Sequence, residues 1–396
     1  MATTNIRQAV MLAGGMGVRL RPYTNTKPKL MVEVGGRPFA EYLIDELKKN
    51  GITELVFLLG YLPEQTQDYF GDGSRFGIKF RYSVTPIEDS TGTRIYKAKE
   101  LLDERFLLLY CDNFLHFNIN QLLSFHLEKN ALMTMIVYRN HYGVTKNNLF
   151  LNKEGYVERY DRERKADGLN GVDLGFFIVE KKVVDLMPKE DFWLFDFFPS
   201  FIPQKKLAGL ATDNLYYSLS TPERMKQTER FFAPRKVIFL DRDGVINKRQ
   251  PKGDWVKKWS EFQFLPGVFE AIKLLKNNHY EIYIISNQSG IARGALTAET
   301  YDEIKRNMIS EIKKNGGHVD GFYHCPHDWD SPCLCRKPKP GMLFQAAIDH
   351  QIDLPSAVFI GDDERDGQAG EAAGVPTILI ESDGSLLDAV KKLVTK

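Results

Sequence analysis

The stretch Lys236-Val-Ile-Phe-Leu240 is a short apolar run, and Asp241-Arg-Asp-Gly-Val-Ile-Asn247 follows it directly. A short apolar run that ends in turn residues is typical of a buried parallel strand. Residues 297–315 have apolar side chains at helical spacing, namely Tyr301, Ile304, Met308 and Ile312. Further strand-like runs occupy residues 280–285, 357–360 and 376–380. This alternation predicts an α/β domain over residues 236–396.

The first half of the chain shows the same alternation. A helical pattern spans residues 38–50, and the strand-like runs are 9–13, 55–60, 106–110, 133–138 and 175–179. The pattern breaks at Pro234, because proline cannot continue a helix. We therefore expect two tandem α/β domains, at residues 1–230 and 236–396, each able to bury its own core.

The composition is that of an ordinary globular protein. The 396 residues include 53 basic and 52 acidic side chains, so the net charge of +1 gives no field that would favour nucleic acid or a membrane as partner. We find no apolar run of about 18 residues and no signal-peptide pattern at the start, and only four cysteines occur. A cytoplasmic protein is expected, and a homo-oligomer is compatible with the sequence.

Polar groups suited to phosphate chemistry follow the predicted strands of the second half. Ligands of open α/β sheets bind where strands end. Phosphoryl transfer through a carboxylate needs a nucleophile, a proton donor and a cation. Asp241 and Asp243 could supply the first two, Ser286 and Lys337 could contact phosphate oxygens, and Asp362 suits Mg²⁺. The alternative for the two aspartates alone is a solvated turn.

A cysteine cluster lies in the same half, with the spacing C-x-H-x5-C-x-C. Three thiolates and one imidazole suit a closed tetrahedral Zn²⁺ site. The predicted ligands are Cys325, His327, Cys333 and Cys335. His324 is a competing imidazole, and reduced buried cysteines are the alternative reading.

These segments, in this order, resemble the haloacid-dehalogenase-like phosphatases, and the match runs through residues 236–396. The resemblance implies Asp241 as nucleophile, Asp243 as general acid and base, and Ser286 and Lys337 as stabilisers of the phosphoryl group. It also implies that Asp241, Asp362 and the Asp243 carbonyl ligate Mg²⁺.

With its zinc loop, this half is similar to the D-glycero-D-manno-heptose 1,7-bisphosphate phosphatases, which are relatives of the histidinol-phosphate phosphatases. That similarity implies substrate recognition by Arg336, and by analogy Asn287 and Arg293 line the same pocket. Two features depart from the pattern. The zinc loop is short, and Asp363 stands where the heptose enzymes usually carry lysine.

A glycine-rich turn follows the first predicted strand, at Leu12-Ala-Gly-Gly-Met-Gly-Val-Arg-Leu-Arg-Pro22. Gly14, Gly15 and Gly17 would let backbone amides approach phosphates, and Arg19 could neutralise them. Lys29 lies in the next segment. A tight turn without function is the alternative for the glycines alone.

Together, these segments resemble the sugar-1-phosphate nucleotidyltransferases over residues 7–228. The resemblance implies a Rossmann-like domain with a mixed, mostly parallel sheet. It implies that Arg19 and Lys29 hold reacting phosphates and that Asp112 binds Mg²⁺. Thr91, Gly92 and Asp173 fall in segments that bind substrate in the family, and Lys165 or Arg162 is a candidate for a second basic contact.

The first half also departs from its family. Ser218 stands where an acidic metal ligand is usual, and Thr93-Arg94 replaces small residues. The domain could therefore use one protein carboxylate, recruit a neighbour such as Asp213, or bind a sugar nucleotide as a sensor without turnover.

The presence of both domains in one chain limits the possible substrates. A phosphatase that removes the C7 phosphate of the heptose bisphosphate yields heptose 1-phosphate, which a nucleotidyltransferase can activate. We expect a bifunctional Mg²⁺-dependent enzyme with structural Zn²⁺, and GTP as the nucleoside triphosphate. The alternative is a hexose-1-phosphate nucleotidyltransferase fused to a histidinol-phosphate-type phosphatase. Neither the base nor the sugar anomer is encoded in these motifs.

Overall fold

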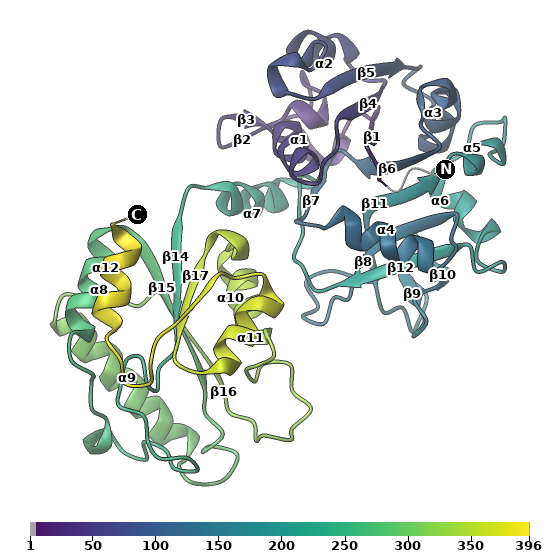
Figure 1. The fold of residues 1–396 in the computed structure, drawn as a ribbon. Helices are drawn as coiled ribbons and strands as arrows, with labels where there is room; N and C mark the ends of the chain where they lie inside the picture. Colours follow the sequence, from purple (N-terminus) through teal and green to yellow (C-terminus); the bar gives the residue numbers. More distant parts are fainter. Residues whose placement is uncertain (1–4, 396) are drawn as a thin grey trace. The chain divides into compact units, whose positions relative to one another are not determined.

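The computed structural model describes residues 5–395, and the chain forms two compact units, Met1–Arg230 and Phe231–Lys396 (Figure 1). Helix α7 (Pro222–Phe232) runs across the boundary between the units. Each unit has its own central sheet, so each is described by itself.

A seven-stranded sheet forms the centre of the first unit. Its strands are β1 (Gln8–Ala13), β4 (Glu54–Leu59), β5 (Lys79–Val84), β6 (Arg105–Tyr110), β8 (Met133–Tyr138), β11 (Val172–Glu180) and β12 (Leu207–Thr212). Their order in space is β12-β8-β11-β6-β1-β4-β5. Strand β11 is antiparallel to both neighbours and the other pairs are parallel, which confirms the expected mixed, mostly parallel sheet.

Short strand pairs and helices surround this sheet. The pairs are β2 (Glu33–Val34) with β3 (Arg37–Pro38), β7 (Asn113–Phe114) with β13 (Tyr217–Ser218), and β9 (Leu149–Leu151) with β10 (Val157–Tyr160). The helices are α1 (Phe39–Lys49), α2 (Pro63–Phe70), α3 (Thr91–Lys97), α4 (Ile119–Glu128), α5 (Lys182–Asp185) and α6 (Leu194–Phe197).

The core of the first unit follows the two-residue repeat of its strands. Val10 and Leu12 of β1 point to one face, because successive strand residues alternate between faces. On that face they join a buried cluster with Ile95 of α3 and Val183 of α5. Strand β1 is thereby fixed as an interior strand of the sheet, between β6 and β4. The glycine-rich turn that follows it therefore lies at the carboxyl end of this strand.

The second unit is built on a five-stranded parallel sheet in the order β16-β15-β14-β17-β18. The strands are β14 (Lys236–Leu240), β15 (Tyr280–Asn287), β16 (Gly321–Cys325), β17 (Val358–Gly361) and β18 (Thr377–Leu379). The helices are α8 (Val268–Asn277), α9 (Ala298–Lys314), α10 (Gly341–His350), α11 (Glu364–Ala373) and α12 (Leu386–Val394). Figure 1 shows α8, α9 and α12 on one face of this sheet and α10 and α11 on the other.

The apolar residues expected on the long helix are buried as predicted. Tyr301, Ile304, Met308 and Ile312 of α9 are each about 1% exposed or less and pack in one cluster with strands β14 and β15. Strand β14 occupies the centre of the sheet. The next strands, β15 and β16, lie on one side of it, and the last strands, β17 and β18, lie on the other. Ligand sites of open α/β sheets lie at such a position, outside the carboxyl ends of the strands.

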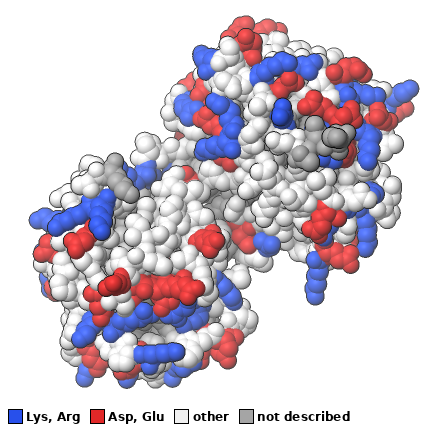
Figure 2. Space-filling model, in the orientation of Figure 1, with Lys and Arg blue, Asp and Glu red and all other residues white. Residues whose placement is uncertain are grey.

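The charges of the described surface are mixed. On the face drawn in Figure 2, basic and acidic side chains stand in small interspersed groups. Among residues 5–395, none of the helices combines the length and the apolar content that a bilayer crossing requires.

Candidate active sites

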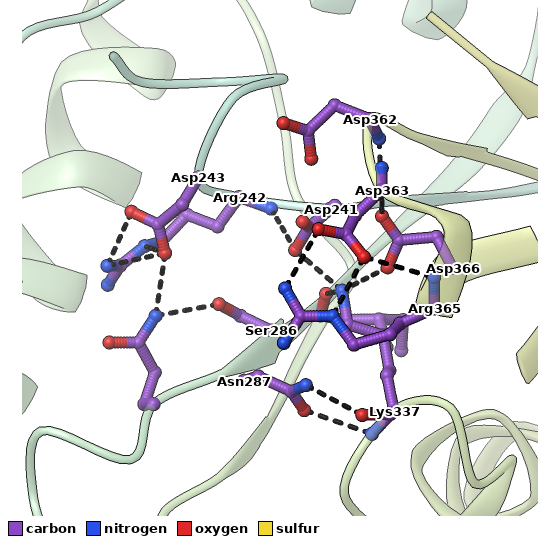
Figure 3. Close-up of polar contacts among 12 residues, drawn as sticks. Asp241, Arg242, Asp243, Ser286, Asn287, Lys337, Asp362, Asp363, Arg365 and Asp366 are labelled. Atoms are coloured by element: carbon purple, nitrogen blue, oxygen red, sulfur yellow. Dashed lines mark hydrogen bonds and ion pairs between the residues drawn. The ribbon is translucent and has the colours of Figure 1, made fainter. Parts of the chain in front are cut away.

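Asp241 lies at the carboxyl end of β14 and is only 7% exposed. Its backbone amide donates to the Ile360 carbonyl of β17 at 2.9 Å, so the sheet itself fixes the residue. The ammonium of Lys337 lies between two carboxylates, 2.8 Å from Asp241 Oδ1 and 2.6 Å from Asp366 Oδ1 (Figure 3). Burial raises the pKa of Asp241 to about 7, although the charge of Lys337 acts to lower it.

Asp243 is held by three donors on the other side of the turn. The guanidinium of Arg242 contacts both of its oxygens, at 3.1 and 2.9 Å, while Asn247 and Gln288 each donate one further hydrogen bond. Burial alone would raise the pKa of Asp243, but Arg242 and these hydrogen bonds together hold it below its ordinary value. Gln288 also donates to Ser286 Oγ at 2.8 Å, so one amide positions both predicted site residues.

Three carboxylates converge on a position suited to a cation. One oxygen each of Asp241, Asp362 and Asp366 lies within 4.8 Å of the others. Asp362 Oδ1 is buried and accepts no hydrogen bond from the described residues, which leaves it free for a ligand. Mg²⁺ prefers such oxygen ligands, so the residues fit the expected ion. That the Asp243 carbonyl also ligates the ion stays a prediction.

A cavity of about 930 Å³ opens beside Asp241 and Lys337. Arg249, Arg336 and Arg365 line it together with Asp363. Arg249 bridges two carboxylates, at 2.9 Å from both Asp362 and Asp363. Arg365 lies 2.7 Å from Asp363, and this contact holds the pKa of Asp363 well below its usual range. The pocket next to Asp241 is therefore rich in guanidinium groups.

Asn287 and Arg293, placed in the pocket by analogy, are both engaged with other parts of the unit. The amide of Asn287 exchanges two hydrogen bonds of 3.0 Å with the backbone of Lys337, which fixes that lysine's position. Arg293 pairs with Asp328 at 2.7 Å and stacks on Trp329, with 3.8 Å to the ring centroid. Asn287 lines the cavity, and Arg293 is not among the lining residues.

The predicted zinc ligands come together at the end of β16. Cys325, His327, Cys333 and Cys335 offer ligand atoms within 4.8 Å of one another. The Sγ atoms of Cys325 and Cys333 are 3.8 Å apart, and His327 Nδ1 is 3.2 Å from Cys335 Sγ. Two thiolates on a tetrahedral zinc, each at about 2.3 Å, would lie about 3.8 Å apart, so the group fits Zn²⁺. His324 instead packs on the ring of Tyr301.

In the first unit, the glycine-rich turn leaves β1 and is followed by a short 3₁₀ turn at Val18–Leu20. Gly17 has φ +61°, and a Cβ there would lie 3.4 Å from Cβ of Lys29, so Lys29 lies against the turn as predicted. Gly14 is buried and Gly15 is exposed. Arg19 is exposed and makes no hydrogen bond or ion pair with the described residues, which leaves its charge available to an anion.

Lys29 forms an ion pair with Asp112, the predicted Mg²⁺ ligand of this unit. Ser218 lies close by, since it pairs with Asn113 across β7 and β13 and Leu219 donates to the Asp112 carbonyl at 2.9 Å. The hydroxyl of Ser218 bonds to Ser220 at 2.9 Å. Asp213, the other candidate, pairs with Arg139 instead. Mg²⁺ bound through one carboxylate and substrate phosphates fits this donor set.

Thr91 and Gly92, expected to bind substrate, lie against the segment 191–194. The hydroxyl of Thr91 accepts a hydrogen bond from the Leu194 amide, and a Cβ on Gly92 would come within 2.1 Å of Phe192. The Asp191 carboxylate accepts hydrogen bonds from Ser90, which fixes the start of α3. Substrate binding by Thr91 and Gly92 stays a prediction.

Asp173, also expected to bind substrate, is enclosed by polar partners. Tyr160 donates to its Oδ2 at 2.9 Å and the Gly175 amide donates to its Oδ1 at 2.8 Å. Burial raises the pKa of Asp173 to about 6. Of the two candidates for a second basic contact, Lys165 pairs with Glu163 on the exposed surface. Arg162 stacks on the ring of Phe195 at 3.9 Å.

Several residues at the two sites were not among the predicted functional residues. Arg94 is 3% exposed and lies against Gly14. Its guanidinium donates to the carbonyls of Leu59, Pro86 and Ile87, and so connects the end of β4 to the segment that follows β5. Gln288, Arg249, Arg365 and Asp366 were also missed. Asp366 belongs to the same acidic segment as Asp362, so the repeated aspartates there were a usable signal.

The comparisons with known proteins find relatives for both halves of the chain. A family model described as nucleotidyl transferase matches residues 8–192, and one described as polynucleotide kinase 3 phosphatase matches residues 236–374. The solved structure of HddC from Yersinia pseudotuberculosis has a TM-score of 0.51 and 20% identity, covering 57% of this chain and 100% of that chain. At this identity the likeness shows a shared fold.

Two curated relatives are more similar in sequence. D-glycero-beta-D-manno-heptose-1,7-bisphosphate 7-phosphatase of Vibrio cholerae is 38% identical over 169 residues, which cover 41% of this chain and 89% of that protein. D-glycero-alpha-D-manno-heptose-1,7-bisphosphate 7-phosphatase of Campylobacter jejuni is 38% identical over 148 residues, which cover 37% and 83%.

Fold and site together define a chain that joins a unit with the nucleotidyltransferase fold to a haloacid-dehalogenase-like phosphatase unit. Through the second unit, the chain belongs to the family of the D-glycero-D-manno-heptose-1,7-bisphosphate 7-phosphatases.

Proposed function

We propose that the second unit removes the C7 phosphate of D-glycero-D-manno-heptose 1,7-bisphosphate and that the first unit transfers GMP from GTP to the resulting heptose 1-phosphate. The observation that carries the first step is the buried Asp241–Lys337–Asp366 group beside a cavity lined by arginines. Heptose bisphosphate is the substrate in the names of the relatives of this unit. The second step is supported by the fold of the first unit, whose Lys29 and Asp112 meet beside the glycine-rich turn.

In the phosphatase step, a carboxylate oxygen of Asp241 forms a bond to the phosphorus while the bond from phosphorus to the C7 oxygen breaks. In this proposal, Lys337 and Ser286 contact the phosphoryl oxygens. Asp243 gives a proton to the leaving C7 oxygen, and then takes one from the water that cleaves the aspartyl-phosphate. Its hydrogen bonds from Arg242, Asn247 and Gln288 suit it to the second role, and the first requires its protonation when substrate binds.

Each proposed metal has a defined contribution. Mg²⁺ held by Asp241, Asp362 and Asp366 would neutralise charge on the phosphoryl oxygens. Zn²⁺ held by the three cysteines and His327 would fix the loop that follows β16.

In the transferase step, an oxygen of the sugar 1-phosphate attacks the α-phosphorus of the triphosphate, and pyrophosphate leaves. The contribution of the protein to such a step is positioning and charge neutralisation. Arg19 grips the triphosphate and Lys29 holds reacting phosphates. Asp112 would hold the Mg²⁺ that accompanies the triphosphate. Since nucleoside triphosphates are the second substrate, we infer that the enzyme acts in the cytoplasm.

The test is an assay of phosphate and pyrophosphate release. Both anomers of the heptose bisphosphate are supplied with Mg²⁺, because the relatives are named for both. Heptose 1-phosphate is then supplied with each nucleoside triphosphate. We expect phosphate release from the bisphosphate and pyrophosphate release that is fastest with GTP. Release of phosphate from histidinol phosphate but not from the bisphosphate would contradict the heptose assignment.

A second function for the first unit is favoured by Ser218, which stands beside Asp112 in place of a carboxylate. In this alternative the unit binds a sugar nucleotide without turnover. Binding without pyrophosphate release, together with restored release in Ser218→Asp, would support it. Release by the unaltered chain would exclude it.

A further inference from the structure

A buried arginine lies on the inner side of the glycine-rich turn of the first unit. Arg94 belongs to α3 and is buried, although the position is one where the sequence departs from the small residues of the similar transferases. A Cβ on Gly14 would lie 2.4 Å from the guanidinium carbon, and a Cβ on Gly60 would lie 2.6 Å from Nη1. Gly14 has no positive φ, so contact with Arg94, and not backbone strain, excludes a larger residue there.

Arg94 connects three segments at the carboxyl ends of neighbouring strands. Its Nη1 donates to the Leu59 carbonyl at 2.9 Å and to the Thr85 hydroxyl. Its Nη2 donates to the carbonyls of Pro86 and Ile87, at 2.9 and 3.1 Å. Leu59 ends β4, and the other three residues follow β5. One side chain thereby holds the turn after β1 beside the segments after β4 and β5, at the edge where open α/β sheets bind their ligands.

The positive charge of Arg94 pairs with no carboxylate in the described part of the chain, residues 5–395. All of its acceptors there are carbonyl or hydroxyl oxygens. Two acidic side chains nearby are engaged elsewhere, since Asp89 pairs with Lys97 and Asp191 accepts hydrogen bonds from Ser90. A buried charge is costly unless an opposite charge compensates it. An anion at the turn would supply that compensation.

Arg94 differs from the other cationic groups of this turn in being fixed before any ligand binds. Lys29 is paired with Asp112. Arg19 is exposed and makes no contact with the described residues, so an anion that binds it must first order its side chain. Hydrogen bonds already hold the guanidinium of Arg94 against Gly14. Its charge and the position of the turn are therefore pre-organised.

We propose that Arg94 is a positioning residue for the nucleoside triphosphate. The inference rests on the proposed transferase function and adds to it a residue that acts through the turn and not by contact with the ligand. The guanidinium holds the glycine-rich turn in the arrangement that presents backbone amides to phosphate, and its buried charge attracts the anion from the inner side of the turn.

The first experiment measures the Kd of GTP with Mg²⁺ by calorimetry on the full chain. Arg94→Met removes the charge and the hydrogen bonds but keeps an apolar stem, and its Kd should be about tenfold higher or more. Arg81→Met is the matched control, because Arg81 pairs with Glu54 at the opposite, amino end of β4. The control should keep the Kd of the unaltered chain. An unchanged Kd in Arg94→Met would overturn the proposal.

Arg94→Lys separates the hydrogen bonds from the charge. Lysine keeps a positive charge, but its single ammonium group cannot reach the same set of oxygens as the planar guanidinium. The Kd of this variant should lie between that of the unaltered chain and that of Arg94→Met. Full recovery of GTP affinity would show that charge alone is sufficient, and would refute the positioning role.

Gly14→Ala tests the contact between Arg94 and the turn. The three atoms closest to the added methyl group all belong to Arg94, so this substitution should raise the Kd of GTP. In the Arg94→Ala background the collision is absent, and the further increase from Gly14→Ala should be about threefold smaller or more. Equal increases in both backgrounds would contradict the proposed contact.

Kinetics separate a displaced turn from a loss of folded protein. Unfolding lowers the amount of active enzyme and therefore the apparent kcat, whereas a displaced turn raises KM for GTP. If the unaltered chain binds GTP and Arg94→Met binds it equally well, the inference is refuted and the transferase assignment stands. If the unaltered chain binds none of the nucleoside triphosphates, the proposed function of the first unit fails, and the inference falls with it.

Discussion

At the residue scale, Gly244 shows how closely the phosphatase site is packed. Its φ is +94°, and a Cβ would lie 2.0 Å from Asp362 Oδ2. We predict that Gly244→Ala displaces Asp362 and lowers Mg²⁺ affinity and phosphatase activity by about 10- to 100-fold, the usual cost of disturbing the support of a metal ligand. Mg²⁺ titration of phosphate release measures the effect.

The matched control is Gly374→Ala. Gly374 also has a positive φ, +71°, but nothing lies within 4 Å of a Cβ there. This variant should lose about 1 kcal/mol of stability from backbone strain and keep its Mg²⁺ affinity. Equal losses of affinity in both variants would show that strain, and not contact with Asp362, is responsible.

Asp173 in the first unit predicts a pH dependence of stability. Burial raises its pKa from 3.8 to about 6, so ionisation is disfavoured in the folded state. Its contribution to stability is complete below about pH 4 and is lost as the pH rises through about 6, by up to ~3 kcal/mol. The Asp173→Asn side chain cannot ionise. The melting temperature of this variant, relative to that of the unaltered chain, should therefore be higher at pH 7.5 than at pH 4.5.

Asp167→Asn serves as the comparison, because Asp167 is exposed in the same segment. The melting temperature of Asp167→Asn, relative to that of the unaltered chain, should be the same at both pH values. The prediction fails if the difference between Asp173→Asn and the unaltered chain is the same at both pH values.

Residues of the site were predictable where a strand places them. Asp241, Ser286 and Asp362 all follow or end strands of one parallel sheet, and the sheet brings them together. Arg249 was not predictable, because its partners are distant in sequence. Asp362 lies 113 positions from Arg249, and no local pattern marks such a pairing.

At the element scale, the loop after β16 links the zinc ligands to the cavity. Trp329 on this loop lines the cavity and donates its indole N–H to Ser289 Oγ at 3.2 Å. We predict that Cys333→Ser lowers the zinc content and raises KM for the bisphosphate, because the loop no longer holds Trp329 in place. Zinc analysis and phosphatase kinetics measure the two effects.

Cys111→Ser is the control for this substitution. Cys111 is a buried cysteine of the first unit and is not one of the four predicted ligands. Its loss should leave the zinc content unchanged. A Cys333→Ser variant that retains full zinc would contradict the proposed ligand set.

The strands with continuous apolar runs were predicted closely, β14 over the same residues and β8 likewise. Strand β11 is longer than expected at both ends, and β5 was not predicted. Strand β5 lies at a sheet edge, and its sequence Lys-Phe-Arg-Tyr-Ser-Val alternates polar and apolar residues, so it contains no continuous apolar run. The order of the strands in each sheet could not be predicted from the sequence either, since it depends on pairings between segments that are distant in the chain.

At the scale of the whole molecule, each unit contains its own sheet, core and site residues. We therefore predict that the two activities can be removed separately. Asp241→Asn should lower phosphate release by about a thousandfold or more, because the proposed nucleophile is lost, and should leave pyrophosphate release from GTP and heptose 1-phosphate intact. Lys29→Ala should do the reverse. Loss of both activities in either variant would contradict independent sites.

The central claim is that one chain carries out both steps in sequence. The most direct measurement is product identification by mass spectrometry after the full chain is incubated with heptose 1,7-bisphosphate, GTP and Mg²⁺. The account predicts a GDP-linked heptose, together with phosphate and pyrophosphate in equal amounts. Recovery of unaltered bisphosphate, or of heptose 1-phosphate with no nucleotide-linked sugar, would contradict it.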